Sequence, residues 1–317
     1  MDCRKSGCLA AGEGRRGANL QPMLPIALPS LPIRPVTRFA PSPTGYLHLG
    51  HVSNAVWTWG IARAAGGTVL LRIEDHDRGR CRPEYERAIR EDLEWLGLLP
   101  DRQSRQSDDA EVYREALERL GRTAHLYGCR CSRADIARRI ESEPADGEER
   151  RYPGTCRDLG IPLHDGAGCR VELGEETVGL DDLRLGPQQQ TPARQCGDLL
   201  LRDPTGNWTY QLCVTVDDAR QGVTLVIRGE DLLTSTGRQI LLGSMLGRGH
   251  PAVFLHHPLI VNEQGAKLSK RDRATGIREL RAGGRSPESV LGEAAWRTGL
   301  LPELRPVGVS ELAGLFR

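Results

Sequence analysis

The chain of 317 residues contains no long uninterrupted hydrophobic run, and its charges almost cancel. The longest apolar stretch near the start, Met23 to Ile33, is interrupted by three prolines, so it can neither span a bilayer nor act as the apolar segment of a secretory signal. The 43 lysines and arginines face 42 acidic residues, which leaves a formal charge of +1. This balance excludes a uniformly basic surface, so a nucleic-acid site would have to be a local basic face.

The cysteines do not have the pattern of a disulfide framework. There are nine of them, an odd number, scattered along a long chain with no secretory signal before them. This usage indicates a reducing, cytoplasmic environment, in which closely spaced cysteines are metal ligands or ordinary core residues.

Strand and helix patterns alternate along most of the chain, which predicts an α/β fold with a parallel sheet and right-handed crossovers. Predicted strands cover 36–40, 68–75, 223–229 and 253–261, and predicted helices cover 50–65, 83–97, 108–121, 234–247 and 287–300. Between residues 129 and 202 the sequence is rich in Gly, Pro and Glu and only weakly periodic, which is typical of a small inserted module. A hairpin is expected over 199–212, turning at Asp-Pro-Thr-Gly-Asn.

These patterns predict five regions. We expect a disordered extension over 1–34, two halves of a catalytic domain over 35–128 and 203–262, the insertion over 129–202, and a loop with a short helical subdomain over 263–317.

The segment RFAPSPTGYLHLGH (38–51) lies where a predicted strand passes into a helix. His48 and His51, three residues apart, share one face of the first helical turn, but no nearby carboxylate completes a metal site with them. Two histidines that merely cap a helix are the simpler alternative. A helix N-terminus also suits phosphate, Gly50 allows a flat base to approach the backbone, and two imidazoles could donate to an oxygen that gains charge.

A second segment, GAKLSKRDR (265–273), carries Lys267 and Lys270 after a predicted strand. A lysine loop by itself is usually exposed surface. Together, His48-Leu49-Gly50-His51 and Lys267-Leu268-Ser269-Lys270 resemble the paired signature motifs of class I aminoacyl-tRNA synthetases. The resemblance implies a Rossmann-like catalytic domain with catalytic His48, His51 and Lys270. It also implies an ATP site that includes Pro41, His48, Gly50, His51, Lys267 and Lys270.

The resemblance extends over about residues 36–275 to the glutamyl-tRNA synthetases, carried also by LLRIEDHDRGR (70–80), TYQLCVTVDD (209–218) and GVTLVIRGEDLL (222–233). It implies L-glutamate, ATP with Mg²⁺, and tRNA as substrates. Fixed cations and one acid suit an amino acid with two carboxylates and one ammonium group. The implied glutamate site comprises Arg38, Phe39, Ala40, Pro41, Ser42, Glu74, Tyr210 and Arg228.

Four residues of the expected insertion could hold a metal. Cys129, Cys131 and Cys156 with Tyr152 offer three thiolates and a phenolate for a tetrahedral zinc site, although small hydrophobic residues near a turn would look similar. The pattern resembles that of truncated paralogues of the glutamyl-tRNA synthetases, which favours structural zinc.

Only 46 residues follow Arg271, so no anticodon-binding domain is expected. The truncated paralogues attach glutamate to queuosine in the anticodon loop of tRNA(Asp), and the resemblance implies the same partner here. Arg130, Arg133, Arg138 and Arg139 could face the RNA, or form a solvated charged helix. Ordinary 3′-end aminoacylation and a catalytically silent zinc- and RNA-binding paralogue remain alternatives.

Overall fold

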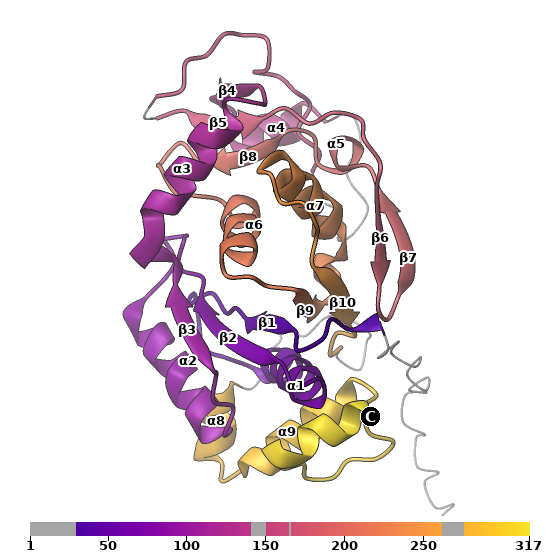
Figure 1. Cartoon of the computed structure of the whole chain (residues 1–317). Helices are drawn as coiled ribbons and strands as arrows, with labels where there is room; N and C mark the ends of the chain where they lie inside the picture. Colours follow the sequence, from indigo (N-terminus) through magenta and orange to yellow (C-terminus); the bar gives the residue numbers. More distant parts are fainter. Residues whose placement is uncertain (1–29, 141–149, 165, 262–275) are drawn as a thin grey trace, which may run out of the picture.

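The computed structural model describes residues 30–140, 150–164, 166–261 and 276–317. Three parallel strands, β1 (Val36–Phe39), β2 (Thr68–Ile73) and β3 (Arg102–Arg105), form one sheet in the order β1-β2-β3. The strands β9 (Leu225–Gly229) and β10 (Val253–His257) are parallel partners in a second sheet. The Thr224 N–H donates to the Val36 carbonyl at 2.9 Å, which places β9 beside β1 at the centre of the molecule (Figure 1). The predicted α/β class is confirmed.

Strand β3 was not predicted, because its sequence Arg-Gln-Ser-Arg has no apolar residue and it lies at the edge of the sheet. The remaining predicted strands and helices appear within a few residues of their expected ends. The helices of ten residues or more are α1 (Leu49–Ala64), α2 (Pro83–Trp95), α3 (Ala110–Leu120), α6 (Tyr210–Arg220), α7 (Thr236–Met245) and α9 (Pro287–Arg297). Shorter ones are α8 (Ile277–Ala282), η2 (Gln106–Asp109), η3 (Glu230–Ser235) and η5 (Val309–Phe316).

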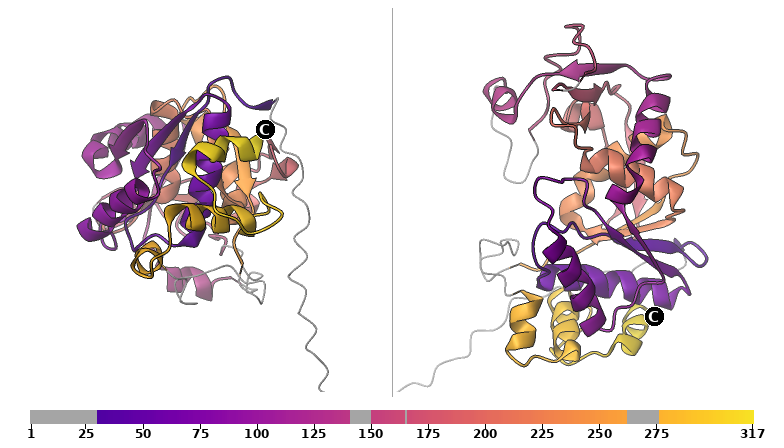
Figure 2. Two further views of the ribbon diagram at one scale, coloured as in Figure 1. Left: turned by 90° about the horizontal axis from the view of Figure 1, so that it is seen from below. Right: turned by 90° about the vertical axis from the view of Figure 1, so that its left-hand side faces the viewer.

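Helix α1 is buried on most of its surface, because the sheet covers one side and the C-terminal helices cover the other (Figure 2). Trp57 and Trp59 are fully buried, and the Trp57 ring meets Phe316 of η5 edge to face at 5.3 Å. The helix that begins at the histidine motif is therefore the centre of the core. Its first turn is held by the surrounding packing as well as by its own hydrogen bonds.

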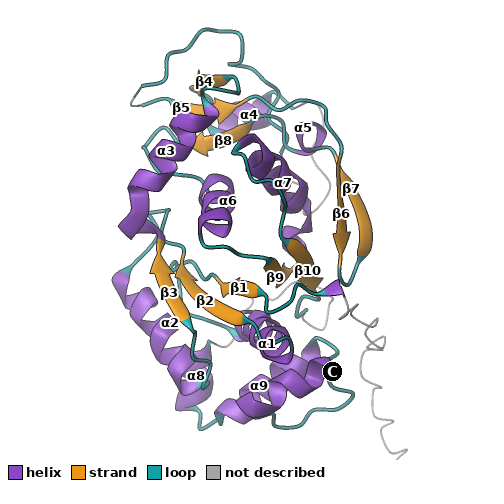
Figure 3. Ribbon diagram, in the orientation of Figure 1, coloured by secondary structure: helices purple, strands orange, loops and turns teal. Residues whose placement is uncertain are grey.

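The range 129–202 divides between two sheets (Figure 3). Strands β4 (Leu126–Cys129), β5 (Gly168–Val171) and β8 (Leu199–Arg202) form a separate antiparallel sheet, with α4 (Arg133–Arg138) and α5 (Pro192–Gln195) nearby. The hairpin of β6 (Val178–Asp182) and β7 (Gly186–Gln190) instead joins the central sheet in the order β7-β6-β10-β9. The expected hairpin over 199–212 is reduced to one bridge, Arg202 to Trp208, because α6 begins at Tyr210.

Across the part of the chain that the structure describes, no helix is both long and apolar enough to cross a membrane.

Helix α2 contains one buried carboxylate, that of Asp92, whose burial the sequence pattern did not predict. Asp92 is 2% exposed, and its Oδ2 atom has no hydrogen-bond partner among the described residues. Burial raises the pKa of Asp92 to about 6, although Arg278 and Arg281 of the α8 segment act to lower it. The folded-state pKa thus exceeds the unfolded value of 3.8. The folded protein therefore binds the Asp92 proton more tightly than the unfolded chain does. The resulting stabilisation is fully present below pH 3.8 and is lost as the pH rises through about 6.

We therefore expect Asp92→Asn to raise the free energy of unfolding at neutral pH, on the order of 1–2 kcal/mol. The gain should disappear in acid, where the wild-type carboxyl is protonated. Urea unfolding at several pH values measures this, with Glu94→Gln on the exposed side of α2 as the control. A variant that is less stable than the parent at neutral pH would contradict the interpretation.

Candidate active site

A cavity of about 430 Å³ opens at the carboxyl ends of β1, β9 and β10, where the two central sheets meet. This is where open parallel sheets bind their ligands. The structure brings most of the predicted site residues into its lining: Arg38, Phe39, Ala40, Pro41, His48, Gly50, His51, Glu74, Tyr210 and Arg228. Sequence reasoning did not identify Ser53, Asn54, Ile227, Gly229, Asp231, Leu232, His257, Leu259 and Ile260, which also line the cavity.

Two groups of predicted residues are not in that lining. Ser42 lies beside the cavity, with its Oγ atom 3.8 Å from the Cys81 sulfur. Lys267 and Lys270 fall outside the described residues. The described residues on either side of their segment adjoin the cavity. Ile260 lines it, and the Ile277 N–H donates to the Leu47 carbonyl at 3.0 Å, next to His48.

The two histidines of the motif close the first turn of α1 reciprocally. The Nδ1 atom of His48 accepts the Gly50 N–H at 3.1 Å, and the His48 N–H donates to Nδ1 of His51 at 3.1 Å. A side chain at position 50 would begin with a Cβ 3.0 Å from the His48 ring, so any residue larger than glycine would crowd this cap. Since both Nδ1 atoms accept, each neutral ring carries its proton on Nε2, and both rings line the cavity. The histidines therefore cap the helix and can also act as donors.

A buried charge network supports the floor of the cavity. Arg72 is fully buried and donates to Glu74 at 3.0 Å and to Asp218 at 2.8 Å. Asp218 also accepts from Arg38 Nε at 3.1 Å. Burial acts to raise the pKa of Asp218, but Arg38 and Arg72 hold it below its usual range. Sequence reasoning missed Arg72 of β2, although it lies two residues before Glu74, which follows the strand directly, and alternate residues of an extended chain share one side.

Arg228 differs from these arginines in having no acidic partner. Its guanidinium is buried and donates to Thr236, Gln239 and His256, and no described carboxylate lies within ion-pair distance. Burial lowers its pKa, and the adjacent Tyr210 hydroxyl opposes this shift. Arg228 thus brings to the cavity a buried positive charge that no described carboxylate pairs. Such a site can bind a carboxylate.

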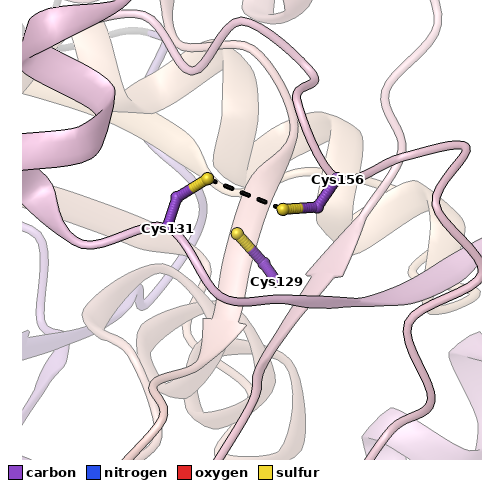
Figure 4. Close-up of side chains that lie close together, drawn as sticks. All are labelled: Cys129, Cys131 and Cys156. Atoms are coloured by element: carbon purple, nitrogen blue, oxygen red, sulfur yellow. Dashed lines mark hydrogen bonds between the residues drawn. The ribbon is translucent and has the colours of Figure 1, made fainter.

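The predicted metal ligands meet at the end of β4 (Figure 4). The sulfurs of Cys129, Cys131 and Cys156 all lie within 4.8 Å of one another, and those of Cys131 and Cys156 are 3.5 Å apart. Ligands about 2.3 Å from a tetrahedral zinc ion would be a little under 4 Å apart, so the cluster fits zinc. Burial and the neighbouring thiols raise the pKa of Cys131 to about 12, a crowding that a cation would relieve.

Tyr152 is in position to provide a fourth ligand. Its hydroxyl oxygen lies 3.5 Å from the Cys129 sulfur and accepts the Cys156 N–H at 2.9 Å. Arg170, which sequence reasoning missed, donates to the Cys129 sulfur at 3.3 Å and stacks on the Tyr152 ring, with its guanidinium carbon 3.7 Å from the ring centroid. The buried guanidinium offsets the negative charge that three thiolates bring to the site.

A second cavity of about 650 Å³ lies between this module and the helices α6 and α7. Tyr210 lines both cavities, so they adjoin at the start of α6. The second lining contains four arginines but only one carboxylate, Asp198, which is already bound by Arg157 at 2.9 Å and by the Tyr127 hydroxyl at 2.5 Å. The arginines are Arg133, Arg150, Arg170 and Arg238. Of the four arginines predicted to face RNA, Arg133 alone lines this cavity.

Comparison with known proteins agrees with the fold. The family described as tRNA synthetases class I (E and Q), catalytic domain, matches residues 35–304. A glutamate tRNA ligase from Elizabethkingia meningosepticum, in complex with its amino acid, superimposes with a TM-score of 0.72 at 27% identity. The alignment covers 88% of this chain and 64% of that protein.

Curated relatives are closer in sequence. The glutamyl-Q tRNA(Asp) synthetase of Symbiobacterium thermophilum is 44% identical over 88% of this chain and 91% of its own length. That of Ralstonia nicotianae is 43% identical over 95% and 94%. The glutamate–tRNA ligase of Hydrogenobaculum sp. is 37% identical over 80% of this chain, which spans 56% of that relative's length.

The fold is that of a class I aminoacyl-tRNA synthetase catalytic domain, and the protein is a ligase of that type. Within this class the chain belongs to the family of glutamyl- and glutaminyl-type synthetases.

Proposed function

We propose that the protein activates L-glutamate with ATP and transfers the glutamate to queuosine in the anticodon loop of tRNA(Asp). The observation that carries the proposal is the single cavity in which two Nε2-protonated histidines at a helix N-terminus adjoin Arg228, a buried cation that no described carboxylate pairs. The first group suits a triphosphate and the second suits an amino acid with two carboxylates. The acceptor is supported by the 44% and 43% identity to relatives named for it.

In the first step the α-carboxylate of glutamate attacks the α-phosphate of ATP, which forms glutamyl-adenylate and releases pyrophosphate. His48 and His51 donate from Nε2 to the phosphate oxygens that gain charge in the transition state. Lys270, assisted by Lys267, holds the β- and γ-phosphates, and Pro41 and Gly50 leave room for the nucleotide. Mg²⁺ accompanies the ATP.

Glutamate is recognised by charge. Arg38 and Arg228 bind its carboxylates, and Glu74 binds its ammonium group. The Tyr210 side chain forms the wall on the side of the second cavity. The remaining predicted members of the glutamate site are Phe39, Ala40, Pro41 and Ser42.

Zinc is held by Cys129, Cys131, Cys156 and Tyr152 in a closed, structural site. When bound, the ion joins the end of β4 to the segment that carries Tyr152 and Cys156, and so shapes one side of the second cavity.

The second cavity receives the RNA acceptor. Its arginines suit phosphate, and it adjoins the activation site at Tyr210. We expect Leu200→Trp, which fills this cavity from β8, to reduce transfer to tRNA about tenfold or more while pyrophosphate exchange stays within about twofold. Leu159→Trp, on an exposed residue outside the cavity lining, is the matched control. Equal loss of both activities would contradict the separation of the two cavities.

The function is tested by glutamate-dependent exchange of pyrophosphate into ATP in the absence of tRNA, measured across all amino acids. No exchange with any of them would exclude the activity and favour a silent RNA-binding role. Transfer of labelled glutamate should fail on tRNA from cells that cannot make queuosine and should survive periodate treatment that destroys the terminal ribose diol. The opposite results would establish 3′-end aminoacylation.

A further inference from the structure

The hydrogen-bond acceptors around Arg228 fix the orientation of its guanidinium group. Three of its five N–H donors are used by uncharged acceptors: Nε donates to His256 Nε2 at 3.0 Å, Nη1 to Gln239 at 2.8 Å and Nη2 to Thr236 at 2.7 Å. These acceptors orient the guanidinium without neutralising it, so its charge is left for a ligand in the cavity that it lines.

The tautomer of His256 follows from these contacts. An arginine N–H can only donate, so the Nε2 atom of His256 must carry a lone pair, and the ring proton lies on Nδ1. That Nδ1 atom is 2.7 Å from Asp182 Oδ2, the distance of a strong hydrogen bond to a carboxylate. Both side chains are fully buried. Burial lowers the pKa of His256, which keeps the ring neutral and able to accept.

Asp182 is itself held rigidly at the end of β6. Its Oδ1 atom accepts the N–H groups of Arg184 at 3.0 Å and Leu185 at 2.9 Å, and its Oδ2 atom also accepts the His256 N–H at 3.0 Å. Burial acts to raise the pKa of Asp182, but the hydrogen bonds from His256 and from these N–H groups hold it below its usual range. The hairpin of β6 and β7 thus places the Asp182 carboxylate beside β10, the strand that pairs with β9 and its Arg228.

We propose that Asp182 and His256 are positioning residues for substrate recognition: Asp182 sets the His256 tautomer, and His256 then fixes the Arg228 guanidinium against a substrate carboxylate. The relay Asp182–His256–Arg228 runs from the β6–β7 hairpin through β10 to β9. It rests on the proposed activation of glutamate and adds two residues that need not contact it. Because the Asp182 charge is separated from Arg228 by the imidazole, the cation is oriented without being paired to an acid.

The variant Asp182→Asn tests the tautomer directly. Its amide can donate to His256 Nδ1, which would move the ring proton to Nε2 and set two donors, His256 and Arg228, against each other. In pyrophosphate exchange we expect the KM for glutamate to rise about tenfold or more while the KM for ATP changes little. The urea unfolding midpoint should fall, because the new amide also faces the backbone N–H of His256. Gln188→Ala, which removes a hydrogen bond within the turn of the same hairpin, should leave both KM values unchanged.

A double variant tests whether the loss of glutamate binding comes from a misoriented Arg228 guanidinium or from general disruption of the structure. A glutamine at position 256 has both an amide N–H and a carbonyl oxygen and no tautomer to invert, so Asp182→Asn with His256→Gln should bind glutamate better than Asp182→Asn alone. A further loss in the double variant would overturn the relay. An unchanged glutamate KM in a folded Asp182→Asn protein would do so as well.

If the parent protein shows no exchange, the proposed function fails, but the relay can still be tested. Nitrogen NMR of the histidine-labelled parent, with the His256 signals assigned by their absence in His256→Gln, should show a protonated Nδ1 and an unprotonated Nε2 at about pH 7. Because this spectrum is recorded on the parent protein, it also tests the relay if the Asp182→Asn variant does not fold. A proton on Nε2 in the parent would refute the proposal.

Discussion

Replacing His51 with asparagine is expected to reduce glutamate-dependent pyrophosphate exchange about 10²- to 10³-fold, the cost of losing one aimed donor to a developing charge. The side-chain oxygen of asparagine can take over the role of Nδ1, which accepts the His48 N–H, so the first turn of α1 keeps its cap. What the variant lacks is the Nε2–H of a ring that lines the cavity. The defect should appear in kcat more than in the KM for ATP, because the donor acts mainly in the transition state.

The exposed residue His250 provides the matched control, since His250→Asn makes the same chemical change away from the cavity. It should leave exchange unaltered. Thermal unfolding of His51→Asn should lie close to that of the parent. If His51→Asn retained full exchange, the histidines would be helix caps only, and the assignment of the phosphate site would be wrong.

The second large effect is expected at the metal cluster. Cys156→Ser should weaken zinc binding about 100-fold or more, because even the loss of an outer partner of a metal ligand costs 10- to 100-fold. Competition with a chromophoric zinc chelator measures this. Loss of zinc should loosen the segment around Tyr152, which borders the second cavity, so transfer to tRNA should fall further than exchange.

Cys169→Ala is the control within the same small sheet. Cys169 is buried in β5 and is not one of the three cysteines whose sulfurs cluster, so we expect it to play no part in binding and the variant to retain one zinc ion. Tyr152→Phe removes only the phenol oxygen and keeps the ring on which Arg170 stacks. It should weaken zinc about tenfold if the oxygen is the fourth ligand. Unaltered zinc binding in Cys156→Ser would exclude the cluster as the metal site.

Part of the site could be predicted because its residues carry local signals. His48, Gly50 and His51 lie within one helical turn, and Cys129 and Cys131 within three residues, so spacing alone indicated that they could act together. Arg38, Glu74 and Arg228 stand at the ends of predicted strands, and the parallel sheet brings those ends to one edge. Tyr210 was predicted from the resemblance and does line the cavity, although it begins a helix rather than the expected second strand of a hairpin.

By itself, then, the sequence determined the α/β alternation, the histidine cap and the set of charged residues at the strand ends, because each depends on neighbours a few residues apart. Tertiary structure alone decided which charges are paired. Arg72 meets Asp218 across 146 residues, and His256 meets Asp182 across 74, after a hairpin that looked like part of the insertion joined the central sheet instead. Burial turns such distant contacts into strong constraints, since a charge removed from water must find a partner in the folded chain or bind one from outside.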